Sequence, residues 1–240
     1  MYEVLYYLAA LIAVICVFSP HEFAHAYVAY RCGDPTAKMN RRMTLNPIKH
    51  LDPYGFVLCM LAGFGWARPV PINPYNFRKY RTGLFLTSIA GVVANYIVAF
   101  LAYPLFLLVA TYFPDSAGTE YLNYFLQMVF WLPFTFSLSV FVFNLLPFSP
   151  LDGFRVVESL TREINPVRKF LKNYGFYILL ILVLESFVCN MIEKYTSFTD
   201  IRYYNILGYV QWFAHNIIGY PIMALWDTVF GYSLPVFTSI

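Results

Sequence analysis

Charged residues are scarce in this chain. Asp, Glu, Lys and Arg make up 12% of its 240 residues, whereas hydrophobic residues make up 60% and aromatic residues 20%. So apolar a composition excludes an ordinary soluble domain of this size. The four cysteines form no CxxC pair and no spacing typical of sulfur-ligated zinc, so we expect reduced thiols. No internal repeat, flexible linker or nucleic-acid signature is present, which favours a single membrane domain over residues 1–240.

Four apolar stretches are long enough to cross roughly 30 Å of hydrocarbon as helices. They are residues 4–30, 83–112, 121–146 and, marginally, 174–188. A fifth apolar region runs from residue 203 to the C-terminus. Because Pro221 and Pro235 interrupt it, we expect one span followed by a re-entrant or interfacial tail. The sequence therefore predicts an all-α polytopic membrane protein.

The basic residues are concentrated in two segments. Nine of the 16 Lys and Arg residues lie in 31–81 and five in 155–172, whereas 113–120 has none. Loops retained in the cytoplasm are rich in Lys and Arg, so both segments are expected there and the N-terminus outside. The absence of early basic residues argues against a removable signal peptide. We expect a multi-pass protein of the cell membrane.

The motif His21-Glu22-Phe23-Ala24-His25 lies at the end of the first apolar run. Two histidines four residues apart project from one helical face and can hold zinc, and Glu22 stands beside them as a general base. At about 1.5 Å per residue, His21 lies about 25 Å from Val4, in the inner third of the bilayer. The alternative is a pair of imidazoles packed between helices, which is costly in hydrocarbon.

A zinc peptidase needs three protein ligands and one open position, so a third ligand must come from elsewhere. Asp152 is the candidate, at the same predicted depth as the histidines. Pro147 and Pro150 prevent a regular helix before it, and Gly153 allows the backbone to approach closely. The alternative is that Asp152 caps a helix from Gly153 onward. The unpaired motif at the same depth favours the ligand role.

With these motifs in place, the chain resembles the site-2 proteases, a family of intramembrane zinc metalloproteases. Residues 21–25 and 144–153 match the two metal segments, and 46–55, 63–74 and 91–95 look like the compact prokaryotic branch. The resemblance implies a three-helix catalytic core, here residues 1–158, with additional helices in 159–240. It also implies substrates that span the membrane, often anti-sigma factors or signal-peptide remnants. Larger members carry PDZ or CBS domains, for which this chain has no room.

Residues 56–66 are apolar but too few to span the bilayer, so a short β-strand or re-entrant loop is expected there. A strand edge at this place can pair with an unwound substrate, whose exposed backbone groups need partners. The alternative is a structural hairpin that plugs the cytoplasmic mouth. The sequence leaves both open.

Five polar or small residues have less specific interpretations. Gly91 and Asn95 share one face of the second span, where helix packing is the default and the resemblance suggests contact with a loop near the site. Asn144 either caps the broken helix or bonds a substrate carbonyl or its oxyanion, a substrate-binding role. His50 is expected to be a polar loop residue rather than a metal ligand. His215 is expected to be packed or interfacial.

These observations predict a zinc endopeptidase with one Zn²⁺ per chain. His21, His25 and Asp152 would bind zinc, and Glu22 would take a proton from the attacking water, whose pKa zinc lowers to roughly 7. A metal transporter is the leading alternative, but the sequence lacks the repeated polar residues along several helices that would form a path for the metal. The second alternative is an inactive scaffold that binds membrane segments without cutting them. The expected partners are transmembrane protein substrates and the lipid bilayer, with no nucleic acid.

Overall fold

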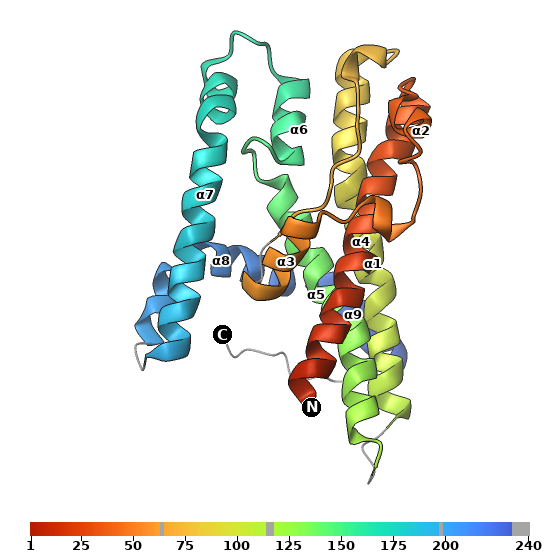
Figure 1. Cartoon of the computed structure of the whole chain (residues 1–240), viewed down its shortest axis with the longest axis vertical. Helices are drawn as coiled ribbons and strands as arrows, with labels where there is room; N and C mark the ends of the chain where they lie inside the picture. Colours follow the sequence, from red (N-terminus) through yellow and green to blue (C-terminus); the bar gives the residue numbers. More distant parts are fainter. Residues whose placement is uncertain (63–64, 114–117, 197–198, 232–240) are drawn as a thin grey trace.

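Four long apolar helices dominate the computed structural model, which describes residues 1–62, 65–113, 118–196 and 199–231 (Figure 1). They are α1 (Tyr2–Cys32), α4 (Tyr80–Tyr112), α5 (Glu120–Leu145) and α7 (Pro166–Tyr195). All four are long and apolar enough to cross a membrane. The four predicted spans are confirmed, and the chain is a multi-pass integral membrane protein with an all-α fold.

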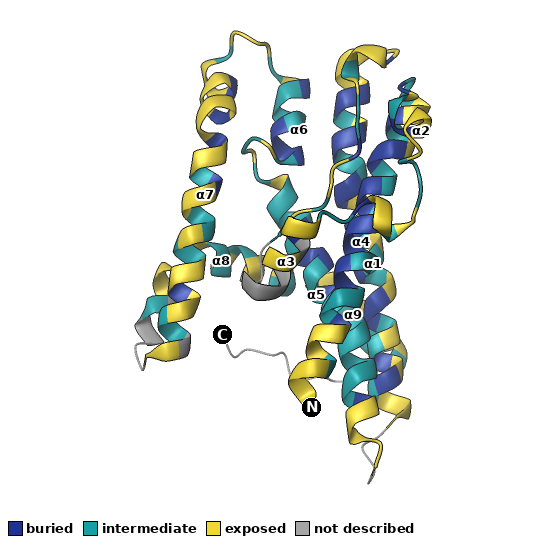
Figure 2. Cartoon of the chain, in the orientation of Figure 1, coloured by how far each residue is buried: buried dark blue, intermediate teal, exposed yellow. Residues whose placement is uncertain are grey.

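The helices α1, α4 and α5 pack against one another and form the core (Figure 1). Between α4 and α5 the fully buried side chains of Tyr103, Phe134 and Leu138 meet in one cluster. Between α1 and α5 a second cluster contains Val17 and Val140. Buried residues line the inner faces of these helices, and exposed apolar residues cover the outside, as a lipid-facing surface requires (Figure 2).

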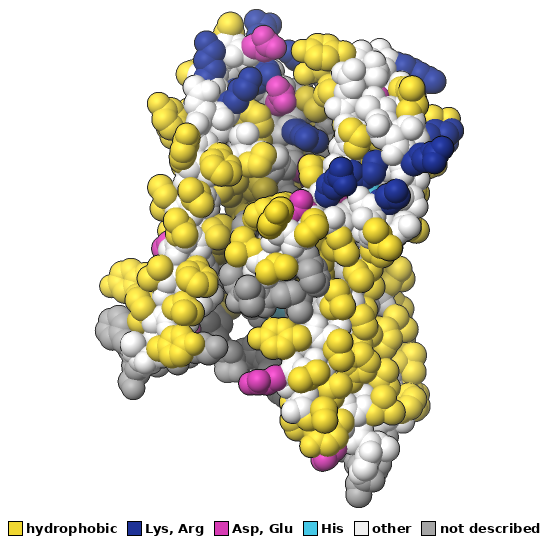
Figure 3. Space-filling model, in the orientation of Figure 1, with side chains coloured by type: hydrophobic (Ala, Val, Ile, Leu, Met, Phe, Trp, Pro, Cys, Tyr) yellow, Lys and Arg dark blue, Asp and Glu magenta, His cyan; other side chains and the backbone are white. Residues whose placement is uncertain are grey.

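Shorter elements connect or cover the spans. The helix α2 (Thr36–Met39) and the 3₁₀ turns η1 (Pro47–Lys49) and η2 (Pro74–Asn76) lie between α1 and α4. The helix α6 (Asp152–Leu160) follows α5 and packs on α4, α5 and α7. The end that carries α2, α6 and the start of α7 displays most of the Lys and Arg side chains in view (Figure 3).

Of the two structures predicted for residues 56–66, a short β-strand or a re-entrant loop, the strand is not formed by the described residues there. Residues Pro53–Ala62 form the helix α3 instead. Asp52 starts this helix, because its Oδ1 accepts hydrogen bonds from the N–H groups of Tyr54 and Gly55 at 3.1 and 2.9 Å. An Asp followed by Pro is a strong helix start, and the run after it shows no strand-like alternation. An isolated antiparallel β-bridge between Leu51 and Ala67 joins the chain before α3 to the chain after it.

The described part of the C-terminal region lacks the span that the sequence predicted ahead of a re-entrant or interfacial tail. It folds as α8 (Ile206–Phe213), the π-helical turn η4 (Ala214–Ile218) and α9 (Tyr220–Phe230), after the 3₁₀ turn η3 (Thr199–Tyr204). No piece is long enough to cross the bilayer alone, because the π turn and Pro221 interrupt the helix. The α9 helix packs on α4, where the Tyr103 hydroxyl donates to Asp227 Oδ1 at 2.8 Å. Pro235 lies outside the described residues.

Candidate metal centre

The first two candidate ligands come from one face of α1. His21 and His25 are buried, with 5% and 4% of their surface exposed. Their Nε2 atoms lie 3.0 Å apart, and the two rings meet edge to face. The i, i+4 spacing of the motif thus brings both nitrogens to one point, as the sequence predicted.

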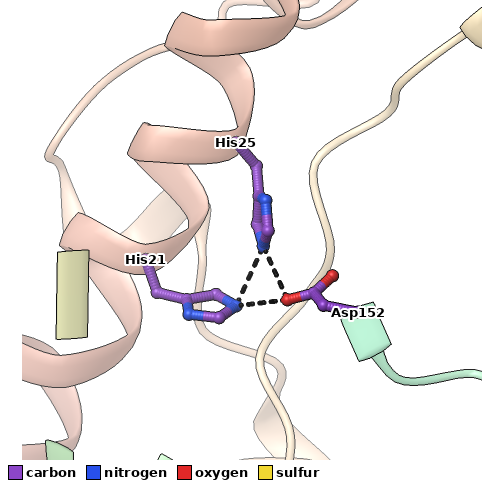
Figure 4. A group of neighbouring side chains, drawn as sticks. All are labelled: His21, His25 and Asp152. Atoms are coloured by element: carbon purple, nitrogen blue, oxygen red, sulfur yellow. Dashed lines mark hydrogen bonds and ion pairs between the residues drawn. The ribbon is translucent and has the colours of Figure 1, made fainter. Parts of the chain in front are cut away.

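The third candidate ligand, Asp152, is the first residue of α6. Its Oδ2 lies 3.3 Å from His21 Nε2 and 3.0 Å from His25 Nε2 (Figure 4). Its side chain makes no cap of α6, whose N-cap is Leu151. A Cβ on Gly153 would lie 2.4 Å from the carbonyl oxygens of Leu145 and Leu146, so glycine is needed for this close approach.

The spacing of the three atoms fits a zinc ion. Zinc with tetrahedral ligands at about 2.0–2.1 Å places neighbouring ligand atoms about 3.3 Å apart. The observed separations are 3.0, 3.0 and 3.3 Å. Two imidazole nitrogens and one carboxylate oxygen are also a ligand set that zinc prefers, and among the described residues this trio is the group found able to hold a metal.

The hydrogen bonds of His25 strengthen this interpretation. Its Nδ1 lies 2.7 Å from the carbonyl oxygen of Thr87 on α4, which can only accept, so Nδ1 carries the proton. In a neutral His25, Nε2 is then a bare acceptor that faces the Asp152 carboxylate. Asp152 Oδ2 is buried and, among the described residues, has no polar partner other than the two histidine nitrogens. A cation between these lone pairs would remove their repulsion.

His21 is oriented by Asn95 on α4. The Asn95 amide nitrogen lies 3.1 Å from His21 Nδ1, and Asn95 Oδ1 is buried with no hydrogen-bond partner in the described part of the chain. The oxygen and nitrogen of an Asn side-chain amide are assigned from their hydrogen-bond partners, so the two atoms can be exchanged by turning the amide over. With the amide turned over, Oδ1 accepts the Nδ1–H of His21 and leaves Nε2 free for a metal. Carbonyl or amide partners of this kind commonly fix ligand histidines.

Gly91 lies between these two contacts on α4. A Cβ at this position would be 2.4 Å from His25 Nε2 and 2.7 Å from His21 Cε1. The backbone of α4 therefore approaches both imidazoles so closely at Gly91 that no side chain fits there. The sequence favoured helix packing for Gly91 and Asn95, and the family resemblance suggested contact with a loop; the structure places both residues against the two histidines of α1.

The expected general base, Glu22, faces a different neighbour. It is buried, with 7% exposed, and its Oε2 accepts a hydrogen bond from the backbone N–H of Val70 at 2.8 Å. Val70 belongs to residues 65–73, which contain no regular helix and carry Pro69 and Pro71. We refer to these residues as the 65–73 segment.

The 65–73 segment is fixed at both ends. Arg42 Nη2 donates to the carbonyl oxygens of Arg68 and Pro69 at 2.7 and 3.3 Å. At the other end the N–H of Asn73 donates to Asp34 Oδ2 at 2.7 Å. Asp34 is fully buried and also accepts from Thr36 and from Asn76.

The carboxyl group of Asp34 is kept in its charged form. Burial acts to raise the pKa of Asp34, but hydrogen bonds from Thr36, Asn76 and the Asn73 N–H outweigh burial and hold the pKa below its ordinary value. Asp34 is therefore a constant acceptor at neutral pH. It ties the turn after α1 to the end of the 65–73 segment.

The remaining sequence candidates lie outside the trio. His50 is fully buried, and its Nε2–H donates to the carbonyl oxygen of Thr44 at 2.7 Å. His215 packs on the rings of Trp131 and Phe134. Asn144 Nδ2 donates to the carbonyl oxygen of Val140 at 3.1 Å, within its own helix. Its role in substrate binding stays a prediction.

Two contributors escaped the sequence analysis. Thr87 and Val70 act through backbone groups. Any residue at position 87 supplies the same carbonyl oxygen, and any residue except proline at position 70 supplies the same N–H. For Val70 a faint signal exists, because the prolines on both sides leave a single N–H in Pro69-Val70-Pro71. For Thr87 the sequence contains no signal.

Comparison with known proteins identifies a family and several similar proteins. A family model described as "Peptidase family M50" matches residues 109–185. "Putative zinc metalloprotease YwhC" of Bacillus subtilis is 46% identical over 175 residues, which are 71% of this chain and 78% of that protein. "Putative zinc metalloprotease Rip2" of Mycolicibacterium smegmatis is 29% identical over 174 residues, 68% of this chain and 62% of that protein. No solved structure matches.

Proposed function

Because this chain belongs to peptidase family M50 and is a zinc metalloprotease of the membrane, we propose that it hydrolyses peptide bonds in or near transmembrane segments. One observation carries the proposal. Three buried ligand atoms lie 3.0–3.3 Å apart, and two of them belong to a helix that can cross a membrane. A site built into such a helix is reached by a substrate that is itself in the membrane.

The residues divide the chemistry between them. His21, His25 and Asp152 would hold zinc, which when bound supplies a Lewis acid for the scissile carbonyl and lowers the pKa of water. Glu22 would accept the proton of the attacking water and return a proton to the leaving amine nitrogen. The Thr87 carbonyl and Asn95 would hold the imidazoles in the tautomer that presents Nε2 to the metal.

The substrate must unwind before its peptide bond reaches the site. Unwinding exposes backbone N–H and C=O groups, which are costly to leave unpaired in an apolar setting. The extended chain near Glu22 is the 65–73 segment rather than the predicted strand at 56–66. We propose that this segment pairs with the unwound substrate, and that anti-sigma-factor-like proteins or signal-peptide remnants are the clients, as the family resemblance suggests.

The same proposal includes the arrangement of the chain. Residues 1–158, which contain all three ligands and Glu22, form the catalytic core, and residues 159–240 add helices to it. The N-terminus lies outside the cell, and the site lies near the cytoplasmic side. The end of the molecule that displays most of the Lys and Arg residues in Figure 3 supports this orientation.

A pair of variants tests the function. Glu22→Gln keeps the shape of the side chain but removes the base, so we expect it to retain zinc and to lose cleavage of a membrane-spanning reporter. Asp152→Ala removes a ligand, so we expect it to lose zinc as well. Zinc content and cleavage are measured on the same purified samples. Full cleavage by Glu22→Gln would refute the mechanism.

The same samples separate the proposal from metal transport. A transporter would carry zinc into liposomes, and this flux would not need Glu22 as a base. A transport path also needs several successive metal-binding sites, whereas the described residues contain one group able to hold a metal. Zinc flux that survives Glu22→Gln, with no cleavage by the unmodified protein, would favour transport.

A further inference from the structure

We propose that the backbone N–H of Val70 positions the general base Glu22, with Arg42 acting through the 65–73 segment to hold that N–H in place. The inference rests on the proposed function, because it assigns the part that Glu22 plays in proton transfer. It begins from one contact, the 2.8 Å hydrogen bond from Val70 N–H to Glu22 Oε2.

The contact is between two buried residues. Glu22 is 7% exposed and Val70 is 5% exposed, so water competes weakly for the hydrogen bond. A hydrogen bond from an N–H to a carboxylate is also stronger than one between neutral groups. One carboxylate oxygen is therefore fixed, and the other is left to meet a reactant. Without the donor, the flexible Glu22 side chain would sample other rotamers and reach the reactive geometry less often.

The local sequence makes Val70 the sole donor of its tripeptide. Pro69 and Pro71 have no N–H and restrict the backbone on both sides of Val70. The Val70 side chain packs into a small buried cluster with Ala26 and Ala37. The direction of the N–H is thus set by the ring constraints and by the packed side chain together.

Arg42 supports the same N–H from outside the site. Its guanidinium binds the carbonyl oxygens of Arg68 and Pro69, the two residues that precede Val70. Arg68 N–H in turn donates to the carbonyl oxygen of His50 at 2.7 Å. Arg42 touches neither the ligand trio nor Glu22 by any hydrogen bond that the described residues show. It is therefore a positioning residue that holds the segment by its hydrogen bonds, and its charge also acts on Glu22 through space.

The experiment compares two substitutions at position 70 in the full-length protein. Val70→Pro removes the N–H, and an extended run of three prolines is a conformation that proline favours. Val70→Ala keeps the N–H and removes side-chain packing, so it reports the cost of packing alone. Zinc content, KM and kcat are measured for both with a membrane-spanning reporter in proteoliposomes.

We expect kcat of Val70→Pro to be lower than that of Val70→Ala by about tenfold to a hundredfold, the range for a lost hydrogen bond to a charged group. Zinc content and KM should agree between the two variants. Equal kcat values would overturn the inference. Should Glu22→Gln be inactive at the same time, the proposed function would survive that result, so the two failures are distinguishable.

Variants of Arg42 give a second, independent test. Arg42→Ala should lower kcat with zinc content unchanged, and adding it to Val70→Pro should lower kcat no further, because both act on one donor. Independent, multiplicative losses would overturn the role of Arg42. If Val70→Pro fails to fold or to bind zinc, Arg42→Lys decides alone, because it keeps the charge near Glu22 but lacks the planar fork that reaches both carbonyl oxygens. Reduced kcat at full zinc supports the inference, and unchanged kcat overturns it.

Discussion

Replacing Gly91 by alanine places a methyl group between two of the three proposed ligands. A Cβ there would lie 2.4 Å from His25 Nε2 and 2.7 Å from His21 Cε1, whereas ordinary contacts begin near 3.4 Å. Either an imidazole or α4 must therefore move by about 1 Å. Metal sites tolerate changes of about 0.2 Å in ligand distance. We expect zinc affinity to fall by at least about a hundredfold, or roughly 2.7 kcal/mol.

Helix stability cannot account for such a loss, because alanine favours a helix over glycine by up to about 1 kcal/mol. The matched control is Val93→Ala on the same helix, whose side chain is 46% exposed and points away from the site. Each protein is equilibrated with chelators of graded strength, and bound zinc is measured together with reporter cleavage. Gly91→Ala that holds zinc as tightly as the unmodified protein and cleaves at full rate would refute the reasoning.

Two further predictions follow from the orientation of His21 and of the whole chain. Asn95→Ala leaves His21 Nδ1 without its partner, so zinc affinity should fall by about tenfold to a hundredfold in the same chelator titration; an unchanged affinity would show that the amide does not orient the ring. In a background without native cysteines, Lys49→Cys should resist a membrane-impermeant thiol reagent in intact cells, whereas Tyr121→Cys should react. The reverse labelling pattern would invert the proposed topology.

The parts of the site that depend on side-chain identity could be predicted from the sequence. The spacing of His21 and His25 fixes their common face on any helix, so the structure had little freedom in placing them. The position of Asp152 near the histidines could be predicted because prolines break the chain just before it, at a depth that the apolar runs set. The four spans were predicted for the same reason, since hydrocarbon thickness dictates their length.

What the sequence did not predict depends on tertiary contacts or on a missed helix start. Residues 53–62 form α3 instead of the strand that was one of the two expectations for 56–66, because Asp52 Oδ1 accepts hydrogen bonds from the first N–H groups of the helix. Residues 206–230 form a broken helix instead of the span expected there, since a π turn has no sequence code. Thr87 and Val70 contribute backbone atoms, whose partners are decided by packing alone.

The depth of the site is set by the end of α5. Asp152 lies at the start of α6, so its position depends on how α6 packs on the helix before it. Gly153 lies against the carbonyl oxygens of Leu145 and Leu146, at 2.4 Å from a would-be Cβ. A larger residue would push α6 outward and carry the carboxylate away from the imidazoles. The Asp152 carboxylate thus reaches the histidines because α5 ends at the same depth in the membrane as His21 and His25 on α1.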